Sequence, residues 1–126
     1  MNKIHYIENE TTSVSNTKYV VVDGSKIKSM EDFVDYVEKE LDFPTSCEHG
    51  VAMLARFEDW IRDLSWFNYD TYIFIIYNYK EFMKNNEKEK KLIISIFDEL
   101  ILPWWEKDVL ECVNGEQTKN FQLYLF

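Results

Sequence analysis

One uninterrupted apolar segment constrains the fold of this chain more than any other feature. Residues 72–77 read Tyr-Ile-Phe-Ile-Ile-Tyr and contain no polar position. A strand with one face in water alternates apolar and polar residues, so this pattern predicts a strand covered on both faces, as in the parallel sheet of an α/β protein. The segment is far shorter than the roughly 20 apolar residues that a membrane-spanning helix needs.

Two further strands and a well-marked helix accompany this segment. Residues 19–22 (Tyr-Val-Val-Val) precede an Asp-Gly turn and predict a buried strand, and residues 121–126 alternate as a third strand does. Ser29, with an acid at Asp32, has the form of a helix N-cap. The apolar stripe of the helix that follows, which Pro44 ends, consists of Met30, Phe33, Val34, Val37 and Leu41.

The order of the elements predicts the fold class. A second helical pattern runs from about residue 47 to 66, and a third covers residues 86–102, where we expect Pro103 to stop it. Strands that alternate with helices indicate an α/β protein. We predict a small three-stranded parallel sheet packed with about four helices.

The two ends of the chain carry weaker signals. Residues 1–17 are polar and aperiodic, which predicts a flexible N-terminal arm, with a short strand at residues 4–7, before a single domain over residues 18–126. Residues 109–113 precede an Asn-Gly pair and predict an extra short strand or hairpin near the C-terminus.

The charge of the chain favours a cationic partner. The 23 Asp and Glu residues outnumber the 14 Lys and Arg residues, for a net charge of −9. Ten acids and three bases lie within residues 31–63, so this window alone carries 3 − 10 = −7. An acidic surface repels phosphate backbones, which disfavours direct nucleic-acid binding and favours a basic protein partner. The alternative is that these charges only solvate helix faces.

Catalytic and metal-binding signals are weak. Cys47-Glu48-His49 is the one cluster of ligand-type side chains, and three adjacent residues need further ligands to surround a metal ion. Cys47 and His49 form a nucleophile pair on paper, which leaves a small-molecule enzyme as an alternative. We expect no enzyme activity, no metal and no cofactor. Cys47 and Cys112 lie far apart and predict reduced thiols in a cytoplasmic protein.

Three stretches of the chain resemble a known family. Residues 19–27 (Tyr-Val-Val-Val-Asp-Gly-Ser-Lys-Ile) and 30–44, which end in Phe-Pro, are followed by residues 57–66 (Phe-Glu-Asp-Trp-Ile-Arg-Asp-Leu-Ser-Trp). They resemble the first strand, first helix and inhibitory-helix exit of the barstar family, intracellular inhibitors of secreted bacterial ribonucleases. The resemblance spans roughly residues 18–126 and implies a barstar-like fold.

The resemblance also implies a binding face. In the family, the second helix and the loop before it plug the ribonuclease active site, with carboxylates in place of substrate phosphates. The second acid of that helix falls on Asp59 here, while the family's first acid falls on Ala55 and its Asn on Met53. We therefore expect that the scaffold is kept and that the target has diverged, as in an immunity protein or antitoxin matched to a different toxin.

These arguments give one set of partner-binding residues and one partner. The predicted residues are Glu48, Glu58, Asp59, Trp60, Asp63 and Glu99. The predicted partner is a cognate cationic nuclease toxin domain, bound 1:1, with no direct contact to nucleic acid or membrane. The alternative is an acidic interaction module for a non-nuclease protein. For Asp59 itself, the local alternative is a surface pair with Arg56 or Arg62 on the same helix.

Overall fold

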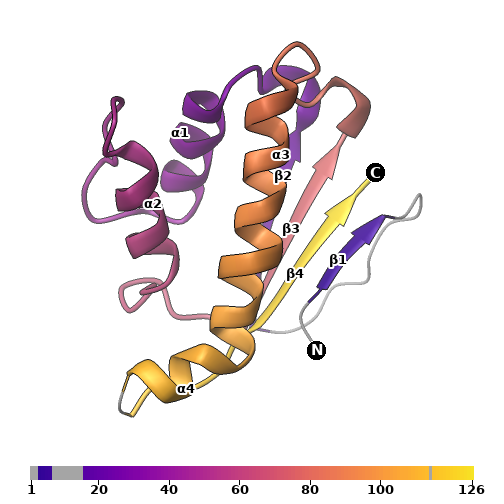
Figure 1. Cartoon of the computed structure of the whole chain (residues 1–126). Coiled ribbons are helices and arrows are strands. Elements are labelled where there is room, and N and C mark those ends of the chain that lie inside the picture. Colours follow the sequence, from indigo (N-terminus) through magenta and orange to yellow (C-terminus); the bar gives the residue numbers. More distant parts are fainter. Residues whose placement is uncertain (1–2, 7–15, 114) are drawn as a thin grey trace.

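The centre of the computed structural model is a parallel sheet of four strands (Figure 1). The structure describes residues 3–6, 16–113 and 115–126. The strands are β1 (Lys3–Tyr6), β2 (Thr17–Asp23), β3 (Thr71–Tyr77) and β4 (Asn120–Leu125), in the order β1-β4-β3-β2. All neighbouring pairs are parallel, so the α/β prediction with three parallel strands in the domain is confirmed.

The N-terminal strand β1 adds a fourth strand at the edge beside β4. Ile4 lies opposite Leu123 and packs, partly buried, against the core. The strand predicted at residues 4–7 is thus present for residues 4–6, and residue 7 lies outside the described residues. The division into an arm over residues 1–17 and a domain over residues 18–126 stays a prediction.

The crossover from β2 to β3 begins with helix α1 (Met30–Glu40), as predicted. The Ser29 hydroxyl accepts a hydrogen bond from the backbone N–H of Asp32 at 3.2 Å, which satisfies one of the free N–H groups at the helix start. The apolar stripe of α1 is buried, and Phe33 occupies its centre. The cap and the stripe are both local signals, which is why the sequence predicts this helix well.

Helix α2 (Met53–Ile61) is shorter than the pattern over residues 47–66 predicts. Glu48 and Gly50 hold left-handed backbone conformations, with φ of 55° and 117°, so the helix cannot begin before them. Leu64, with φ of 55°, ends the helical path on the other side. Cys47 and Leu64, in the loops before and after α2, are buried as core residues are, whereas Val51 is fully exposed.

The crossover from β3 to β4 is one long bent helix. It comprises α3 (Glu87–Ile96), wide π-type turns at Phe97–Ile101 and Trp104–Asp108, and α4 (Val109–Cys112). Figure 1 shows α4 at a steep angle to α3. Within the described ranges, no helix is long and apolar enough to cross a membrane.

Two predictions for this region are wrong. Pro103 does not stop the helix, because it keeps helical dihedral angles (φ −65°, ψ −34°) and the wide turns on both sides absorb its missing N–H. The extra strand or hairpin at residues 109–113 is not formed, since Val109–Cys112 are helical and β4 pairs in parallel with β3 and β1.

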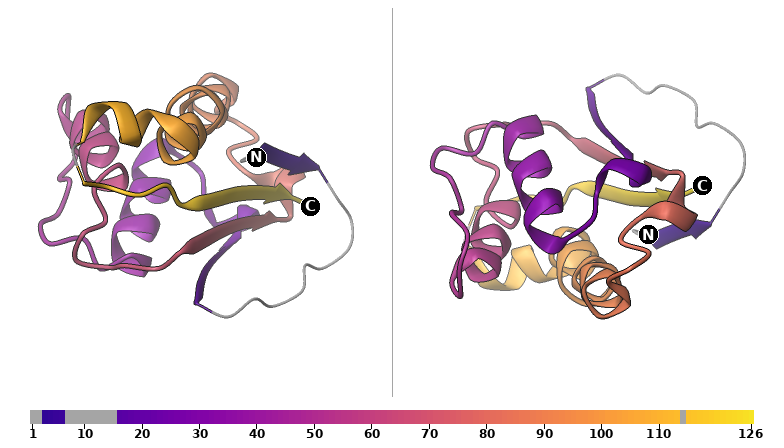
Figure 2. Two further views of the ribbon diagram at one scale, coloured as in Figure 1. Left: turned by 90° about the horizontal axis from the view of Figure 1, so that it is seen from below. Right: turned by 90° about the horizontal axis from the view of Figure 1, so that it is seen from above.

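The core lies on one face of the sheet. Figure 2 shows the helices gathered on that side. The ring of Phe33 in α1 meets three rings edge-on, those of Phe57, Phe82 and Phe97, at centroid distances of 6.2, 5.9 and 6.2 Å. Helices α1 and α2 and the first wide turn of the long helix thus share one aromatic centre. The buried strand residues beneath it are Val20, Val22, Tyr72, Phe74, Ile76, Phe121, Leu123 and Leu125.

The second face of the sheet is only partly covered. Ile73 is buried on this face, whereas Val21 is 44% exposed and Tyr77 is 39% exposed. The strand predicted to be covered on both faces is therefore covered at its centre and open toward its end.

Candidate protein-binding site

The loop between α1 and α2, residues 41–52, forms one wall of the candidate site. The Cys47 side chain is fully buried beneath this α1–α2 loop, while Val51 at its far end is fully exposed. Glu48 and Gly50 carry the left-handed backbone conformations described above. A non-glycine residue in that region is uncommon and marks a tightly constrained loop.

A hollow of about 410 Å³ lies between this loop and α2. Its lining residues are Thr45, Ser46, Glu48, Arg56, Asp59, Trp60 and Asp63. We call it the acidic hollow, because its lining contains three carboxylates against one arginine, beside an indole and two hydroxyl groups. It brings together four of the six predicted binding residues: Glu48, Asp59, Trp60 and Asp63.

Helical geometry explains why the α2 residues meet there. Met53, Phe57 and Ile61 are buried at four-residue spacing, which fixes the face that α2 turns to the core. Arg56, Asp59 and Trp60 of the lining stand at i, i+3 and i+4 and so lie along one other face of the same helix. Asp63, which also lines the hollow, follows in the turn just after the end of α2.

The two other predicted residues lie outside this lining. Glu58 is half-buried on α2, and its backbone carbonyl accepts a hydrogen bond from Nε of Arg62 at 3.1 Å. Glu99 is exposed on the first wide turn of the long helix. Their role in binding stays a prediction.

Asp59 has a local partner and is still open to solvent. Its carboxylate lies 3.3 Å from a guanidinium nitrogen of Arg62, and its side chain is 78% exposed. The predicted surface pair is therefore formed with Arg62, whose guanidinium also lies 5.3 Å from the ring centre of Trp104. Arg56 instead donates to the backbone carbonyl of Cys47 at 3.0 Å. An exposed pair of this spacing is worth roughly 0.2–0.5 kcal/mol, which leaves Asp59 able to bind another cation.

Two tryptophans support the hollow. Trp60 is half-buried and meets Trp66 edge-on at 5.2 Å. Trp66 donates from Nε1 to the carbonyl of Leu41 at 3.0 Å and packs edge-on against Phe43. Trp66 therefore packs against the core and forms an edge-on neighbour of the Trp60 ring.

The geometry does not support a Cys47–His49 nucleophile. Burial, with the nearby Glu38 carboxylate as a second cause, raises the pKa of Cys47 to about 12, so its thiol stays protonated at neutral pH. The His49 ring lies against Asp35 on α1, with 2.9 Å between Nε2 and the carboxylate. Across the described ranges, no group of three or more His, Cys, Asp or Glu side chains is arranged to hold a metal ion.

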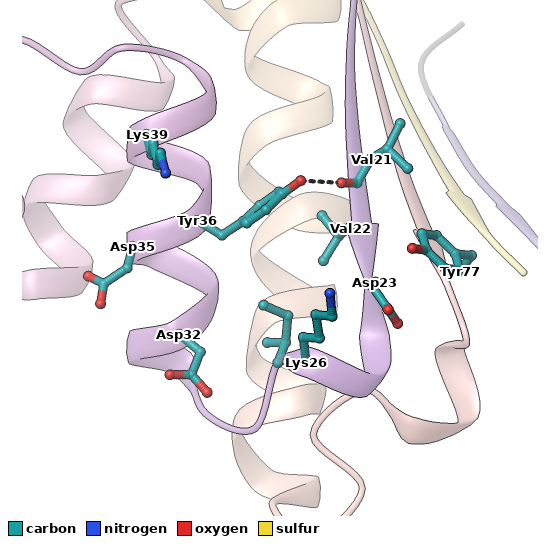
Figure 3. Close-up of a pocket in the computed structure, with 10 residues that line it drawn as sticks. Val21, Val22, Asp23, Lys26, Asp32, Asp35, Tyr36, Lys39 and Tyr77 are labelled. Carbon is teal, nitrogen blue, oxygen red and sulfur yellow. Dashed lines mark hydrogen bonds between the residues drawn. The ribbon is translucent and has the colours of Figure 1, made fainter.

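A second hollow, of about 460 Å³, lies between α1 and the free edge of β2 (Figure 3). The Tyr36 hydroxyl crosses it and donates to the backbone carbonyl of Val21. Nothing in the sequence pairs these two positions, so only the structure reveals the contact. The charge of this second hollow is nearly balanced, because its lining has three acids against two lysines. The charged lining residues are Asp23, Lys26, Asp32, Asp35 and Lys39.

The fold and the acidic hollow define a small α/β protein with an acidic, aromatic face on its second helix. A family model described as Barstar (barnase inhibitor) matches residues 17–125, nearly the whole chain. The chain therefore belongs to the barstar family. Members of this family are inhibitors that bind ribonucleases, and they are not enzymes. No curated protein and no solved structure matches the chain.

Proposed function

We propose that this protein is an immunity protein or antitoxin that binds a cognate cationic ribonuclease toxin 1:1 in the bacterial cytoplasm. In this proposal α2 and the α1–α2 loop occlude the active site of the toxin. The acidic hollow carries the proposal, because it gathers Glu48, Asp59 and Asp63 around Trp60. A ribonuclease cleft uses Lys, Arg or His⁺ to hold phosphates, and carboxylates on an inhibitor meet the same groups.

The position of the charge indicates a target other than barnase. One turn before Asp59, the family pattern has an acid and an Asn where this chain has Ala55, which is exposed, and Met53, which is buried. The exposed acids lie instead toward the end of α2, at Asp59 and Asp63, and on the loop at Glu48. A displaced charge pattern disfavours a nuclease whose cations lie elsewhere, since specificity can rest on contacts that reject the wrong partner.

Trp60 adds an aromatic wall to this face. An indole beside carboxylates suits a guanidinium or ammonium group, since the ring face attracts a cation while the carboxylates bind it. Partly exposed tryptophans are also common anchors of protein interfaces. Both contributions favour a cationic protein surface as the ligand.

The proposal is tested by co-expression with the product of the neighbouring gene. We expect the two proteins to co-purify as a 1:1 complex and the nuclease activity of the partner on RNA to be suppressed at equimolar inhibitor. Barnase is the comparison enzyme, and we expect weaker inhibition of it. If the co-expressed partner cleaves nucleic acid and this protein does not suppress the cleavage, the proposal is wrong. A co-purified partner without nuclease activity supports the non-nuclease interaction module instead.

A further inference from the structure

The α1–α2 loop is held in place by carboxylates of α1. Glu38 accepts a hydrogen bond from the backbone N–H of Cys47 at 2.8 Å with one carboxylate oxygen, and from the hydroxyl of Ser46 at 3.3 Å with the other. One half-buried side chain therefore fixes two successive loop residues.

A second carboxylate of α1 holds the loop one step further along the chain. Nε2 of His49 lies 2.9 and 3.0 Å from the two carboxylate oxygens of Asp35, and Nδ1 lies 3.7 Å from Glu31. Figure 3 shows the Asp35 carboxylate and the Tyr36 ring projecting from α1 in different directions.

Helix α2 holds the same loop from the other side. Arg56 donates to the backbone carbonyl of Cys47 at 3.0 Å, while the N–H of that residue binds Glu38. Glu48 therefore stands between two fixed neighbours, Cys47 and His49, in a left-handed backbone conformation that costs a glutamate more than a glycine. This arrangement sets the position from which Glu48 lines the acidic hollow.

We propose that Asp35 and Glu38 are positioning residues of the proposed ribonuclease-binding site. They hold the α1–α2 loop so that Glu48 lies on the wall of the acidic hollow, and they hold it best when His49 is protonated. The partner-binding part of this proposal rests on the proposed function. The positioning of the loop by Asp35 and Glu38 does not rest on the proposed function, and it can be measured on the free protein.

The direction of the pH dependence follows from the groups that face His49. The hydrogen bond that His49 donates to the Asp35 carboxylate raises the pKa of His49 above its ordinary value of 6.5, and the charges of Asp35, Glu31 and Glu38 add to this. A group with a raised pKa in the folded state contributes its full stabilisation below the ordinary value and loses it as the pH rises through the folded value. The loop should therefore loosen above about pH 6.5.

The free protein provides the first test, by amide hydrogen exchange measured with NMR at a series of pH values. After correction for intrinsic exchange, we expect protection of the Cys47 amide to fall as the pH rises above 6.5. Asp35→Asn should flatten this pH profile, and because the Asp35 side chain is 50% exposed, the variant should fold. Protection should decrease in the order wild type, Glu38→Gln, Glu38→Ala, since Gln keeps one acceptor oxygen.

The matched control is Glu40→Gln. It removes one negative charge from the same helix, and among the described residues Glu40 makes no hydrogen bond to the loop. Its pH profile should match that of the wild type. If Asp35→Asn and Glu38→Ala leave the protection of Cys47 unchanged at every pH, the two residues do not hold the loop and the proposal is wrong.

The second test uses the nuclease captured by co-expression. We expect Glu38→Ala to raise Kd about tenfold, and Glu48→Gln to have a much smaller effect in the Glu38→Ala background than in the wild type, because coupled residues are not additive. Additive effects of the two substitutions would overturn the positioning role. If the loop of the wild type shows the expected protection but no nuclease is bound, the proposed function is wrong. The role of Asp35 and Glu38 in holding the loop would still stand.

Discussion

Asp59 is the residue at which the sequence motif, the exposed position and the acidic hollow coincide. It lies on one face of α2 with Arg56 and Trp60, and within the part of the chain that the structure describes its one ion pair is the exposed one with Arg62. Breaking an exposed ion pair costs little free energy. A carboxylate that is enclosed with a partner cation at an interface attracts it more strongly, because the local dielectric constant is lower. Asp59 should therefore matter for binding and hardly at all for stability.

Asp59→Ala tests this separation. We expect Kd for the captured nuclease to rise at least tenfold, since truncating one member of a buried interfacial charge pair costs on the order of 2–5 kcal/mol. The unfolding temperature should hardly change. Isothermal titration calorimetry measures the first quantity and a thermal melt the second. Glu111→Ala, which removes the same charge from an exposed position on α4, should leave Kd unaltered. An unchanged affinity in Asp59→Ala would remove Asp59 from the interface.

At the scale of elements, the bent helix is joined to the end of α2 by two tryptophans. Trp105 is fully buried, stacks on Phe121 of β4 with an interplanar angle of 5°, and donates from Nε1 to the carbonyl of Ile61 at 2.9 Å. Trp104, only half-buried, donates in the same way to the carbonyl of Arg62. These carbonyls lie at the C-terminal end of α2, where a helix leaves its last carbonyl groups without internal partners.

Trp105→Phe should lower the free energy of unfolding by about 1–3 kcal/mol, because it leaves the buried Ile61 carbonyl without a donor. The matched variant Trp104→Phe should cost less, since water can reach the carbonyl that it releases. Urea denaturation measures both, with a shifted midpoint at an unchanged slope. Equal losses in the two variants would show that burial does not decide the cost of the missing hydrogen bond.

The same elements show how far sequence reasoning reaches. Helix α1 is predicted from local signals, the Ser29 cap and the apolar stripe, and Asp59 is predicted from the family resemblance of residues 57–66. The helical course of the chain through Pro103 is not predicted from the sequence, because it depends on the contacts that Trp105 makes with residues distant in sequence. The roles of Asp35 and Glu38 leave no trace in the sequence either, since they depend on how the α1–α2 loop folds back onto α1.

At the scale of the whole molecule, most of the net charge lies on one part of the fold. Residues 31–63, with a charge of −7, form α1, the α1–α2 loop and α2, which stand together at one end of the molecule in Figure 1. The lysine-rich residues 80–91, with five lysines against three glutamates, run instead from η2 (Tyr79–Glu81) into the beginning of α3. Such a separation orients an approaching cation toward the acidic end before any contact forms.

This field should be visible in the association rate with the captured nuclease. The Debye length falls from about 10 Å at 0.1 M salt to about 3 Å at 1 M, so we expect the association rate constant to drop about tenfold or more over this range, with a smaller change in the dissociation rate constant. Stopped-flow fluorescence of the tryptophans measures both. Asp63→Asn and Glu111→Gln remove one charge each, from the acidic hollow and from α4. If the local field steers the partner, only Asp63→Asn should slow association at low salt; equal slowing by both would mean that net charge alone decides the rate.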